Sequence, residues 1–398
     1  MSNSYSYVKL KELCDVNQGL QIPIESRFTE NAPNRYFYIT VQFLKASYTN
    51  KFYVENPPSS SICNEEDILI VRTGSTGQIV TGVEGCFHNN FFRVNFNKEL
   101  IHGRYLYHCL NTKEKYRDML RRAGVTTIPD LNHFMFLDME IPVPKKQNQI
   151  EIAKTLDTLD SKIELNNRIN AELEAMAKTL YDYWFVQFDF PDKNGKPYKS
   201  SGGTLVWNEE LKREIPEGWE VKDLGEIINI FDSKRIPLSR GEREKKVGNI
   251  PYYGATSVMG YVDEYIFDDD YVLIAEDGSV MDEKGFPIVQ FIWGKTWVNN
   301  HAHVIQAKNV INNEYIFYLV KTISVIQIMS GSIQLKINQE NLKRVKVCVP
   351  DENTLKKFAS FAIPVRKQLI NAIEENQKLT ELRDWLLPML MNGQVKAA

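Results

Sequence analysis

The same sequence pattern occurs twice in this chain of 398 residues, and the repeat limits the possible folds more than any other feature. Matching segments follow one another in the same order in both halves: 10–16 with 224–230, 68–75 with 272–279, and 141–144 with 347–350. The first two pairs are 214 and 204 residues apart, as expected for domains whose loops vary in length. From Pro144 and Pro350 onward the separation is constant at 206 residues. We therefore expect two related halves, each ending in a regular element.

The element that follows each proline has the periodicity of a long helix. Mostly apolar residues recur at alternating steps of four and three, which is the seam of a coiled coil. The seam positions are Ile152, Leu156, Leu159, Ile163, Asn170, Leu173 and Leu180 in the first half, and Phe358, Val365, Leu369, Asn376, Leu379 and Leu386 in the second. A helix of roughly 33 residues is about 50 Å long.

Polar residues and a proline interrupt this seam. Asn170 and Asn376 occupy the same heptad position, and in antiparallel helices they would lie near each other and hydrogen-bond; the alternative is that each faces water. Arg383 lies near one end, where its charged group can extend into solvent. Pro364 is expected to kink or break the second helix, because proline removes a helical hydrogen bond.

The segments before each helix have a different composition. Short runs rich in Val, Ile, Tyr and Phe alternate with turns of Gly, Pro and Asn, which predicts strands. A helix is expected over residues 104–122, with a counterpart near 314–328. Residues 189–203 (DFPDKNGKPYKSSGG) are polar and rich in Gly, Ser, Pro and Lys, which is typical of a flexible linker.

We therefore expect an α+β protein, with two pseudo-symmetric α/β domains separated by two long antiparallel coiled-coil helices. The expected parts are a first domain at 1–144, a central helix at 145–188, a linker at 189–215, a second domain at 216–350 and a distal helix at 351–398.

Composition limits where such a protein works. The longest apolar runs fall far short of the ~18 residues that a membrane span requires, and the first residues lack the features of a signal peptide. The five cysteines are scattered, which favours reduced thiols and a cytoplasmic location. The net charge of −3 counts mildly against nucleic acid as a partner, but residues 233–246 hold six Lys or Arg against two Glu.

No catalytic pattern is present in the sequence. Neither a phosphate-binding G-x-x-x-x-G-K-[ST] loop nor a G-x-G-x-x-G turn occurs. The segment 56–59 (NPPS) lacks the aromatic residue that a DNA methyltransferase motif would stack on a flipped base. His301 and His303 share one face of a strand, but no third metal ligand lies near them in sequence. We expect no metal, no cofactor and no catalytic residues in this chain.

The doubled order of motifs resembles the specificity (S) subunit of type I restriction-modification systems. In each half a start of the form Leu-x-Glu-Leu/Ile-x-x-Val/Ile, at Leu10 and Leu224, is followed by a strand ending in Gly. A Gly-to-Pro segment (124–144 and 331–350) then leads into the helix. Residues 180–185 (LYDYWF) and 215–219 (IPEGW) are also typical of that family. The resemblance covers nearly the whole chain.

The resemblance implies a non-catalytic subunit whose two α/β domains are target-recognition domains, each reading one half of a bipartite site in double-stranded DNA. The helices would act as a spacer and as the docking surface for two methyltransferase (M) subunits, which methylate adenine. Separate restriction (R) motor-nuclease subunits would join the complex. S-adenosylmethionine, Mg and ATP are expected on those partners. The alternatives are a coiled-coil scaffold protein and a self-sufficient DNA-modifying enzyme.

Candidate DNA contacts follow from side-chain chemistry alone, because Arg and Lys suit phosphates and guanine while Asn suits adenine. The alternative for each basic segment is a solvated surface. The candidates are Arg72, Arg121, Arg122 and Asn132 in the first domain, and Lys234, Arg235, Arg240 and Arg243 in the second.

Overall fold

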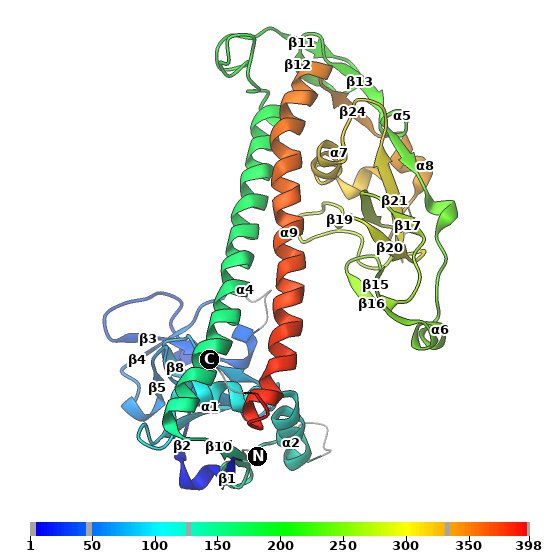
Figure 1. Cartoon of the computed structure of the whole chain (residues 1–398). Helices are drawn as coiled ribbons and strands as arrows, with labels where there is room; N and C mark the ends of the chain where they lie inside the picture. Colours follow the sequence, from blue (N-terminus) through cyan, green and yellow to red (C-terminus); the bar gives the residue numbers. More distant parts are fainter. Residues whose placement is uncertain (1–4, 45–49, 125–128, 331–334, 396–398) are drawn as a thin grey trace. The chain divides into compact units, whose positions relative to one another are not determined.

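The computed structural model describes residues 5–44, 50–124, 129–330 and 335–395. It divides into two compact units, one formed by residues 1–166 with 374–398 and the other by residues 167–373. Each unit contains one α/β domain together with a segment of each of the two long helices, α4 (Lys146–Tyr181) and α9 (Glu352–Met391) (Figure 1). In the part of the chain that the structure describes, no helix combines the length and apolar character of a membrane span.

The domain of the first unit contains two four-stranded sheets and a short strand pair. One sheet has the order β2-β9-β6-β7, with β2 Cys14–Gln18, β9 Phe91–Phe96, β6 Ile68–Val71 and β7 Ile79–Val80. The other has the order β4-β3-β8-β5, with β4 Tyr53–Glu55, β3 Arg35–Ile39, β8 Gly85–Phe87 and β5 Ile62–Cys63. Strand β1 (Ser6–Lys9) pairs with β10 (Glu140–Val143), and the helices are α1 (Gly103–Leu110), α2 (Lys113–Ala123) and α3 (His133–Leu137).

The domain of the second unit repeats this topology. Its sheets have the orders β14-β21-β18-β19 and β16-β15-β20-β17. The strands are β14 Ile228–Ile230, β15 Val247–Tyr253, β16 Val258–Val262, β17 Phe267–Asp268, β18 Tyr271–Ala275, β19 Val289–Ile292, β20 Lys295–Val298 and β21 Ala302–Ala307. Strand β13 (Glu220–Asp223) pairs with β24 (Lys346–Val349), as β1 pairs with β10, and β22 (Met329–Ser330) pairs with β23 (Lys336–Ile337). The helices are α5 Leu224–Ile227, α6 Arg240–Lys245, α7 Asn313–Val320 and α8 Gln339–Lys343.

A buried hydrogen bond fixes which residues of the two domains correspond. The Tyr105 hydroxyl on α1 donates to the Pro142 carbonyl at 2.8 Å, and the Tyr315 hydroxyl on α7 donates to the Cys348 carbonyl at 2.7 Å. Both tyrosines are almost fully buried, at 0% and 1% exposed. The expected fold class, an α+β protein built from a repeated domain and long helices, is confirmed.

The residue before each tyrosine joins its domain to a long helix, with opposite charge in the two units. In the first unit Arg104 binds Asp157 of α4, with its terminal nitrogen 2.6 Å from the carboxylate. In the second unit Glu314 binds Arg366 of α9 at 3.0 Å. The helix position that corresponds to Arg366 in the first unit is Asp160, since 366 − 206 = 160. The two domains are thus held to their helices by ion pairs of reversed polarity.

Within the first unit the segments of α4 and α9 run antiparallel. Asp160 on α4 binds Arg383 on α9 at 2.9 Å, and Asn166 on α4 donates to the Asn376 side chain on α9 at 2.9 Å. The residue numbers therefore rise along α4 while those of their partners fall along α9. All the predicted seam positions in both units are buried or partly buried. Asn170 belongs to the second unit, so its predicted hydrogen bond to Asn376 stays a prediction.

Two expected helices were wrong, and so was a break at Pro364, whereas a kink there stays a prediction. Helix α9 continues without a break through Pro364, where Ala362 and Val365 on either side are buried in the core of the second unit. The helix expected over 104–122 is two helices, because Thr112 caps α2 by accepting from the Lys115 amide at 3.1 Å. Its counterpart at 314–328 also divides, with α7 ending at Val320 before a short 3-10 turn at Val325–Gln327.

The segment 189–203 is folded and is not a flexible linker. Asp189 accepts from the amide and the hydroxyl of Ser200 at 2.7 and 2.6 Å. The ring of Phe190 stacks between Tyr198 and Trp219, with ring centroids 4.6 and 4.9 Å away. A hairpin of β11 (Leu205–Asn208) and β12 (Arg213–Pro216) follows. Aromatic packing therefore orders a segment whose polar composition alone favours disorder.

Candidate nucleic-acid interface

Arg72, a predicted contact, lies directly after β6 in the first domain. Its guanidinium makes two hydrogen bonds to the Asp130 carboxylate, at 2.5 and 2.8 Å. The hydrogen bond from Arg72 holds the pKa of Asp130 below its usual value. A backbone hydrogen bond connects the same two segments, because the Leu131 amide donates to the Arg72 carbonyl at 3.0 Å. Both side chains of the pair stay partly exposed, at 28% for Arg72 and 47% for Asp130.

The second domain has the same connection with the charges exchanged. Glu276 corresponds to Arg72, and Lys336 corresponds to Asp130, since 336 − 206 = 130. The Lys336 ammonium lies 2.9 Å from the Glu276 carboxylate. The Ile337 amide donates to the Glu276 carbonyl at 2.9 Å, as the Leu131 amide does in the first domain. One structural position therefore presents opposite charges in the two domains.

Asn132 begins a short helix next to this pair. Its side chain accepts from the Met135 amide at 2.9 Å and so caps α3. Asn338 caps α8 in the same way in the second domain, accepting from the Glu340 amide at 2.8 Å. The predicted role of Asn132 as a base contact stays a prediction, beside this structural role.

Arg121 and Arg122 lie in the last turn of α2, which packs against α3. Both bind Asp118, and Arg122 also lies 3.4 Å from Asp138. Burial alone would raise the pKa of Asp118, but the hydrogen bonds and charges of Arg121 and Arg122 together lower it below its usual value. The Arg121 side chain is 78% exposed and can reach a ligand, whereas Arg122 is more enclosed.

An exposed aromatic residue on α3 was not predicted. Phe134 is 79% exposed, while its neighbour Phe136 is fully buried. Four of the five residues in 133–137 (HFMFL) are apolar, so the sequence does not say which phenylalanine faces the core. The structure therefore brings Arg72, Asn132, Phe134 and the end of α2 to one side of the first domain.

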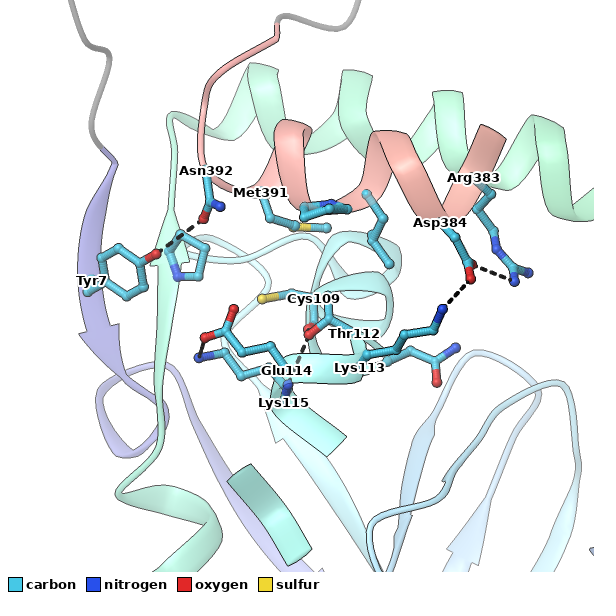
Figure 2. Close-up of a pocket in the computed structure, with 14 residues that line it drawn as sticks. Tyr7, Cys109, Thr112, Lys113, Glu114, Lys115, Arg383, Asp384, Met391 and Asn392 are labelled. Atoms are coloured by element: carbon cyan, nitrogen blue, oxygen red, sulfur yellow. Dashed lines mark hydrogen bonds and ion pairs between the residues drawn. The ribbon is translucent and has the colours of Figure 1, made fainter. Parts of the chain in front are cut away.

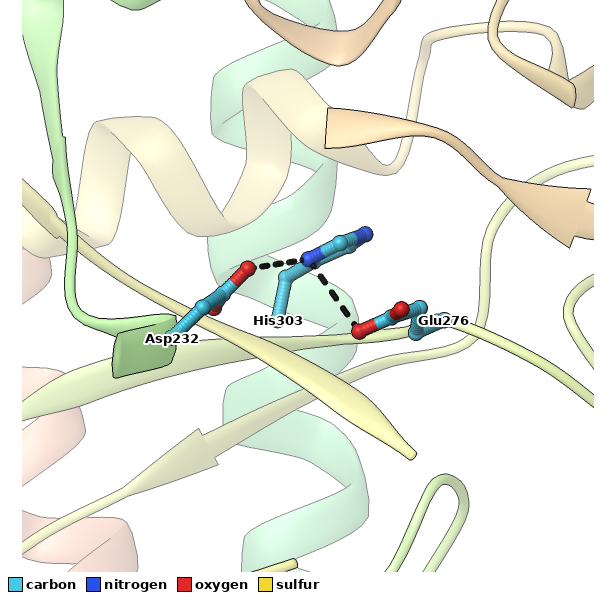
Figure 3. Close-up of side chains that lie close together, drawn as sticks. All are labelled: Asp232, Glu276 and His303. Carbon is cyan, nitrogen blue, oxygen red and sulfur yellow. Dashed lines mark hydrogen bonds and ion pairs between the residues drawn. The ribbon is translucent and has the colours of Figure 1, made fainter. Parts of the chain in front are cut away.

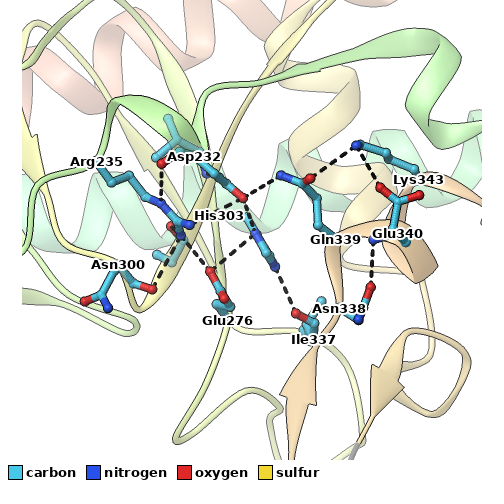
Figure 4. Close-up of polar contacts among 12 residues, drawn as sticks. Asp232, Arg235, Glu276, Asn300, His303, Ile337, Asn338, Gln339, Glu340 and Lys343 are labelled. Atoms are coloured by element: carbon cyan, nitrogen blue, oxygen red, sulfur yellow. Dashed lines mark hydrogen bonds and ion pairs between the residues drawn. The ribbon is translucent and has the colours of Figure 1, made fainter.

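In the second domain Arg235 is enclosed in a polar network rather than exposed (Figure 4). Its guanidinium lies 2.7 Å from Glu276 and donates to the Ala302 carbonyl at 2.7 Å. Only 12% of the side chain is exposed. The predicted DNA contact by Arg235 stays a prediction, but most of its donors are used inside the domain.

Three side chains of this network are of the types that ligate metal ions. Ligand atoms of Asp232, Glu276 and His303 lie within 4.8 Å of one another (Figure 3). Protein groups already occupy them. His303 Nδ1 lies 2.6 Å from Asp232 and its Nε2 lies 3.0 Å from the Ile337 carbonyl, while basic side chains bind Glu276. The cluster joins strands β18 and β21 to the segment before α8.

The remaining predicted residues lie on or near α6. The Lys234 ammonium lies 5.0 Å from the ring centre of Phe231, and Arg240 pairs with Glu244 at 2.9 Å on an exposed face. Arg243 donates to the Met259 carbonyl at 3.2 Å. Exposed apolar residues that the sequence did not identify accompany them on β15 and β16: Val247, Val258, Met259 and Tyr261.

Comparison with known proteins identifies this architecture. The sequence model of a family described as the type I restriction modification DNA specificity domain matches residues 3–175 and 216–383. The chain is similar to two Methanocaldococcus jannaschii proteins, the type I restriction enzyme MjaIX specificity subunit (25% identical, covering 91% of this chain and 84% of the relative) and the MjaVIII specificity subunit (24% identical, covering 92% and 88%).

A solved structure has the same fold. The S subunit of a type I restriction-modification system from M. genitalium superposes with a TM-score of 0.63 at 18% identity, covering 98% of this chain and 96% of that one. The residues that match the family model contain both copies of the repeated domain and most of both long helices. The chain belongs to the family of type I restriction-modification DNA specificity proteins.

Proposed function

We propose that this chain is the DNA sequence-specificity subunit of a type I restriction-modification complex, and that each α/β domain reads one half of a bipartite target. The observation that carries this proposal is the domain repeat within one chain of the family. Two equivalent domains can bind two half-sites about one helical turn apart, ~34 Å, on one face of the duplex. The long helices α4 and α9 would set the unread gap between them.

The difference between Arg72 with Asp130 and Glu276 with Lys336 indicates that the two half-sites differ. Arginine presents a planar fork of donors that matches guanine, whereas lysine presents a compact charge. Arg72 and Asp130 are partly exposed in the first domain, whereas in the second domain Glu276 is bound inside the network and Lys336, at 52% exposed, is the group that DNA can reach. If both domains approach the groove in the same way, they will not select the same bases.

Phe134 and Arg121 are our strongest candidates for DNA contacts in the first domain. A large apolar side chain exposed on the surface lowers solubility and can mark a binding surface. Apolar side chains of DNA-binding proteins can insert between the base steps of DNA. Arg121 supplies charge for the phosphates from the adjacent helix. Phe134→Ala should lower DNA affinity about ten-fold without changing stability, because the side chain is 79% exposed. Ile24→Ala, at 71% exposed, serves as the control for loss of an exposed apolar side chain elsewhere in this domain.

The chain would act without catalytic residues of its own. Two M subunits would bind S-adenosylmethionine and methylate adenine, and R subunits using Mg and ATP would carry out restriction. The decisive test is expression of the chain with its methyltransferase, followed by sequencing of methylated bases. A bipartite methylated motif that disappears without this chain is expected. Methylation by the purified chain alone, or a complex without DNA affinity at low salt, would contradict the proposal.

A second experiment tests the role of the helices as a spacer. Removing one heptad from each, residues 159–165 and 365–371, should shorten the unread gap or abolish methylation, since each heptad contributes about 10 Å of helix. Methylation with an unchanged gap would show that the helices do not set the spacing.

A further inference from the structure

The first unit contains a cavity of about 440 Å³ between α1, the start of α2 and the last turns of α9 (Figure 2). Its apolar wall includes Cys109, Leu387 and Met391. Polar groups stand at its rim, where Lys113 binds Asp384 at 2.8 Å and the Tyr7 hydroxyl lies 3.3 Å from Asn392. The cavity thus combines an apolar interior with a few fixed polar groups, which is the usual character of a ligand site.

The internal repeat allows this cavity to be compared with the corresponding place in the second unit. Thr112 lines the cavity, and its hydroxyl donates to the Cys109 carbonyl at 3.1 Å. Thr322 makes the same bond to the Leu319 carbonyl at 2.7 Å. The two threonines therefore hold equivalent positions. Leu387 on α9 corresponds to Tyr181 on α4, since 387 − 206 = 181.

In the second unit this space is filled by Tyr181. The residue is 2% exposed, its ring stacks on Tyr318 with centroids 5.6 Å apart, and its hydroxyl is hydrogen-bonded to Thr322. Burial raises the pKa of the phenol, so it is present as the neutral donor. Phe185, one turn further on, closes the cluster at a centroid distance of 5.0 Å from Tyr181.

In the first unit the equivalent side chains are smaller. Leu387 and Met391 stand where Tyr181 and Phe185 stand in the second unit, so the space beside Thr112 is open among the described residues. The Thr112 hydroxyl accepts one hydrogen bond, from the Lys115 amide, and retains a second lone pair for another donor. An apolar wall with the Thr112 acceptor at the place that Thr322 occupies beside Tyr181 is complementary to a phenol.

We propose that this cavity binds a tyrosine side chain presented by a partner protein. The bound phenol would take the place that Tyr181 takes in the second unit, with its ring beside Leu387 and its hydroxyl donating to Thr112. The inference rests on the proposed function only in placing the partner within the restriction-modification complex. The second unit supplies this group from its own chain, whereas the first unit would receive it on assembly.

The cavity itself is tested with a small probe on the full chain. p-Cresol, which is the tyrosine side chain, should bind in the millimolar range and more tightly than toluene, which lacks the hydroxyl. Leu387→Tyr should raise the midpoint of thermal unfolding and weaken p-cresol binding at least ten-fold, because the new side chain fills the space. Leu382→Tyr, on an exposed part of α9 outside the cavity, is the matched control and should change neither quantity.

Failure of p-cresol to bind, or equal binding by Leu387→Tyr, would overturn the inference. Nuclear magnetic resonance of the p-cresol methyl group detects binding at this affinity. A preference for toluene over p-cresol would show that Thr112 does not recognise the hydroxyl and would refute the assignment of a tyrosine.

The affinity of the chain for its methyltransferase subunit tests whether the bound tyrosine comes from a partner protein. Leu387→Tyr should lower the affinity of the chain for its methyltransferase subunit at least ten-fold, while Leu382→Tyr should not. If the unmodified chain binds the methyltransferase and Leu387→Tyr binds equally well, the inference fails and the proposed function stands. If the unmodified chain does not bind at all, the proposed function fails, and the p-cresol measurement alone decides the cavity. A dimer of the chain alone that Leu387→Tyr dissociates would identify a second copy as occupant and refute a foreign partner.

Discussion

Replacing Glu314 by glutamine should stabilise the second unit at alkaline pH, although it removes one member of an ion pair. Glu314 on α7 and Arg366 on α9 are 5% and 8% exposed, and their charged groups are 3.0 Å apart. The Arg366 guanidinium also lies over the rings of Phe291 and Phe317, at 4.2 and 4.6 Å. Burial raises the pKa of Glu314 to about 7, an effect that Arg366 reduces and Asp270 strengthens.

The sign of the pH dependence follows from this raised pKa. The unfolded carboxyl ionises near its ordinary pKa of 4.5, while the folded one keeps its proton up to about pH 7. Its contribution to stability is therefore fully present below pH 4.5 and is lost as the pH rises to 7. A difference of about 2.5 pKa units corresponds to about 3 kcal/mol. A neutral glutamine resembles the protonated acid and should not lose this free energy.

Calorimetric unfolding at pH 5 and pH 8 measures the effect. Glu314→Gln should match the original chain at pH 5 and exceed it at pH 8, by roughly 6–12 °C in the transition of the second unit. Glu352→Gln, on the exposed start of α9, controls for the loss of an acid. If Glu314→Gln is instead destabilised by about 3–5 kcal/mol at pH 8, the attraction to Arg366 outweighs desolvation and our reasoning is refuted.

Two further predictions concern the first unit. Burial raises the pKa of Asp157, but hydrogen bonds from His108 and Arg104 lower it further, to about 2, so its contribution to stability is present above pH 3.8 and is lost as the pH falls to 2. Asp157→Asn should cost about 1–2 kcal/mol in urea unfolding at pH 7, allowing for solvent screening, and less at pH 3; an equal cost at both would contradict this. Asn376→Leu should cost about 1 kcal/mol because it leaves the Asn166 amide with one partner fewer. The double change of Asn166 and Asn376 to leucine should restore thermal stability, and a double variant less stable than the single one would refute an energetic cost of the polar pair.

The long helices could be predicted because their signal is local and repeated. A constant separation of 206 residues and steps of four and three depend only on neighbouring positions. A break at Pro364 was predicted because proline costs about 3 kcal/mol in the interior of a helix. Here the buried side chains of Ala362 and Val365 keep the helix in place.

The candidate interface was harder to predict because it depends on tertiary pairing. Arg72 finds Asp130 58 residues away, and Arg235 finds Glu276 41 residues away. Nothing in the neighbouring sequence distinguishes an arginine enclosed by such a partner from one open to DNA. The sequence did contain the signal that 189–203 is folded, since Phe190 and Tyr198 are aromatic residues within a polar segment.

The reversed ion pairs between domain and helix have a consequence for how such proteins diversify. A domain transferred from the first half into the second would bring Arg104 to the position of Glu314, beside Arg366, and two buried like charges would oppose its docking. A domain moved into the same half of a chain whose long helix carries the same charged residue meets the opposite charge that it met before. Recombination that creates new DNA specificities should therefore be tolerated when it preserves the half in which a domain originates, and the two halves should evolve as separate modular pools.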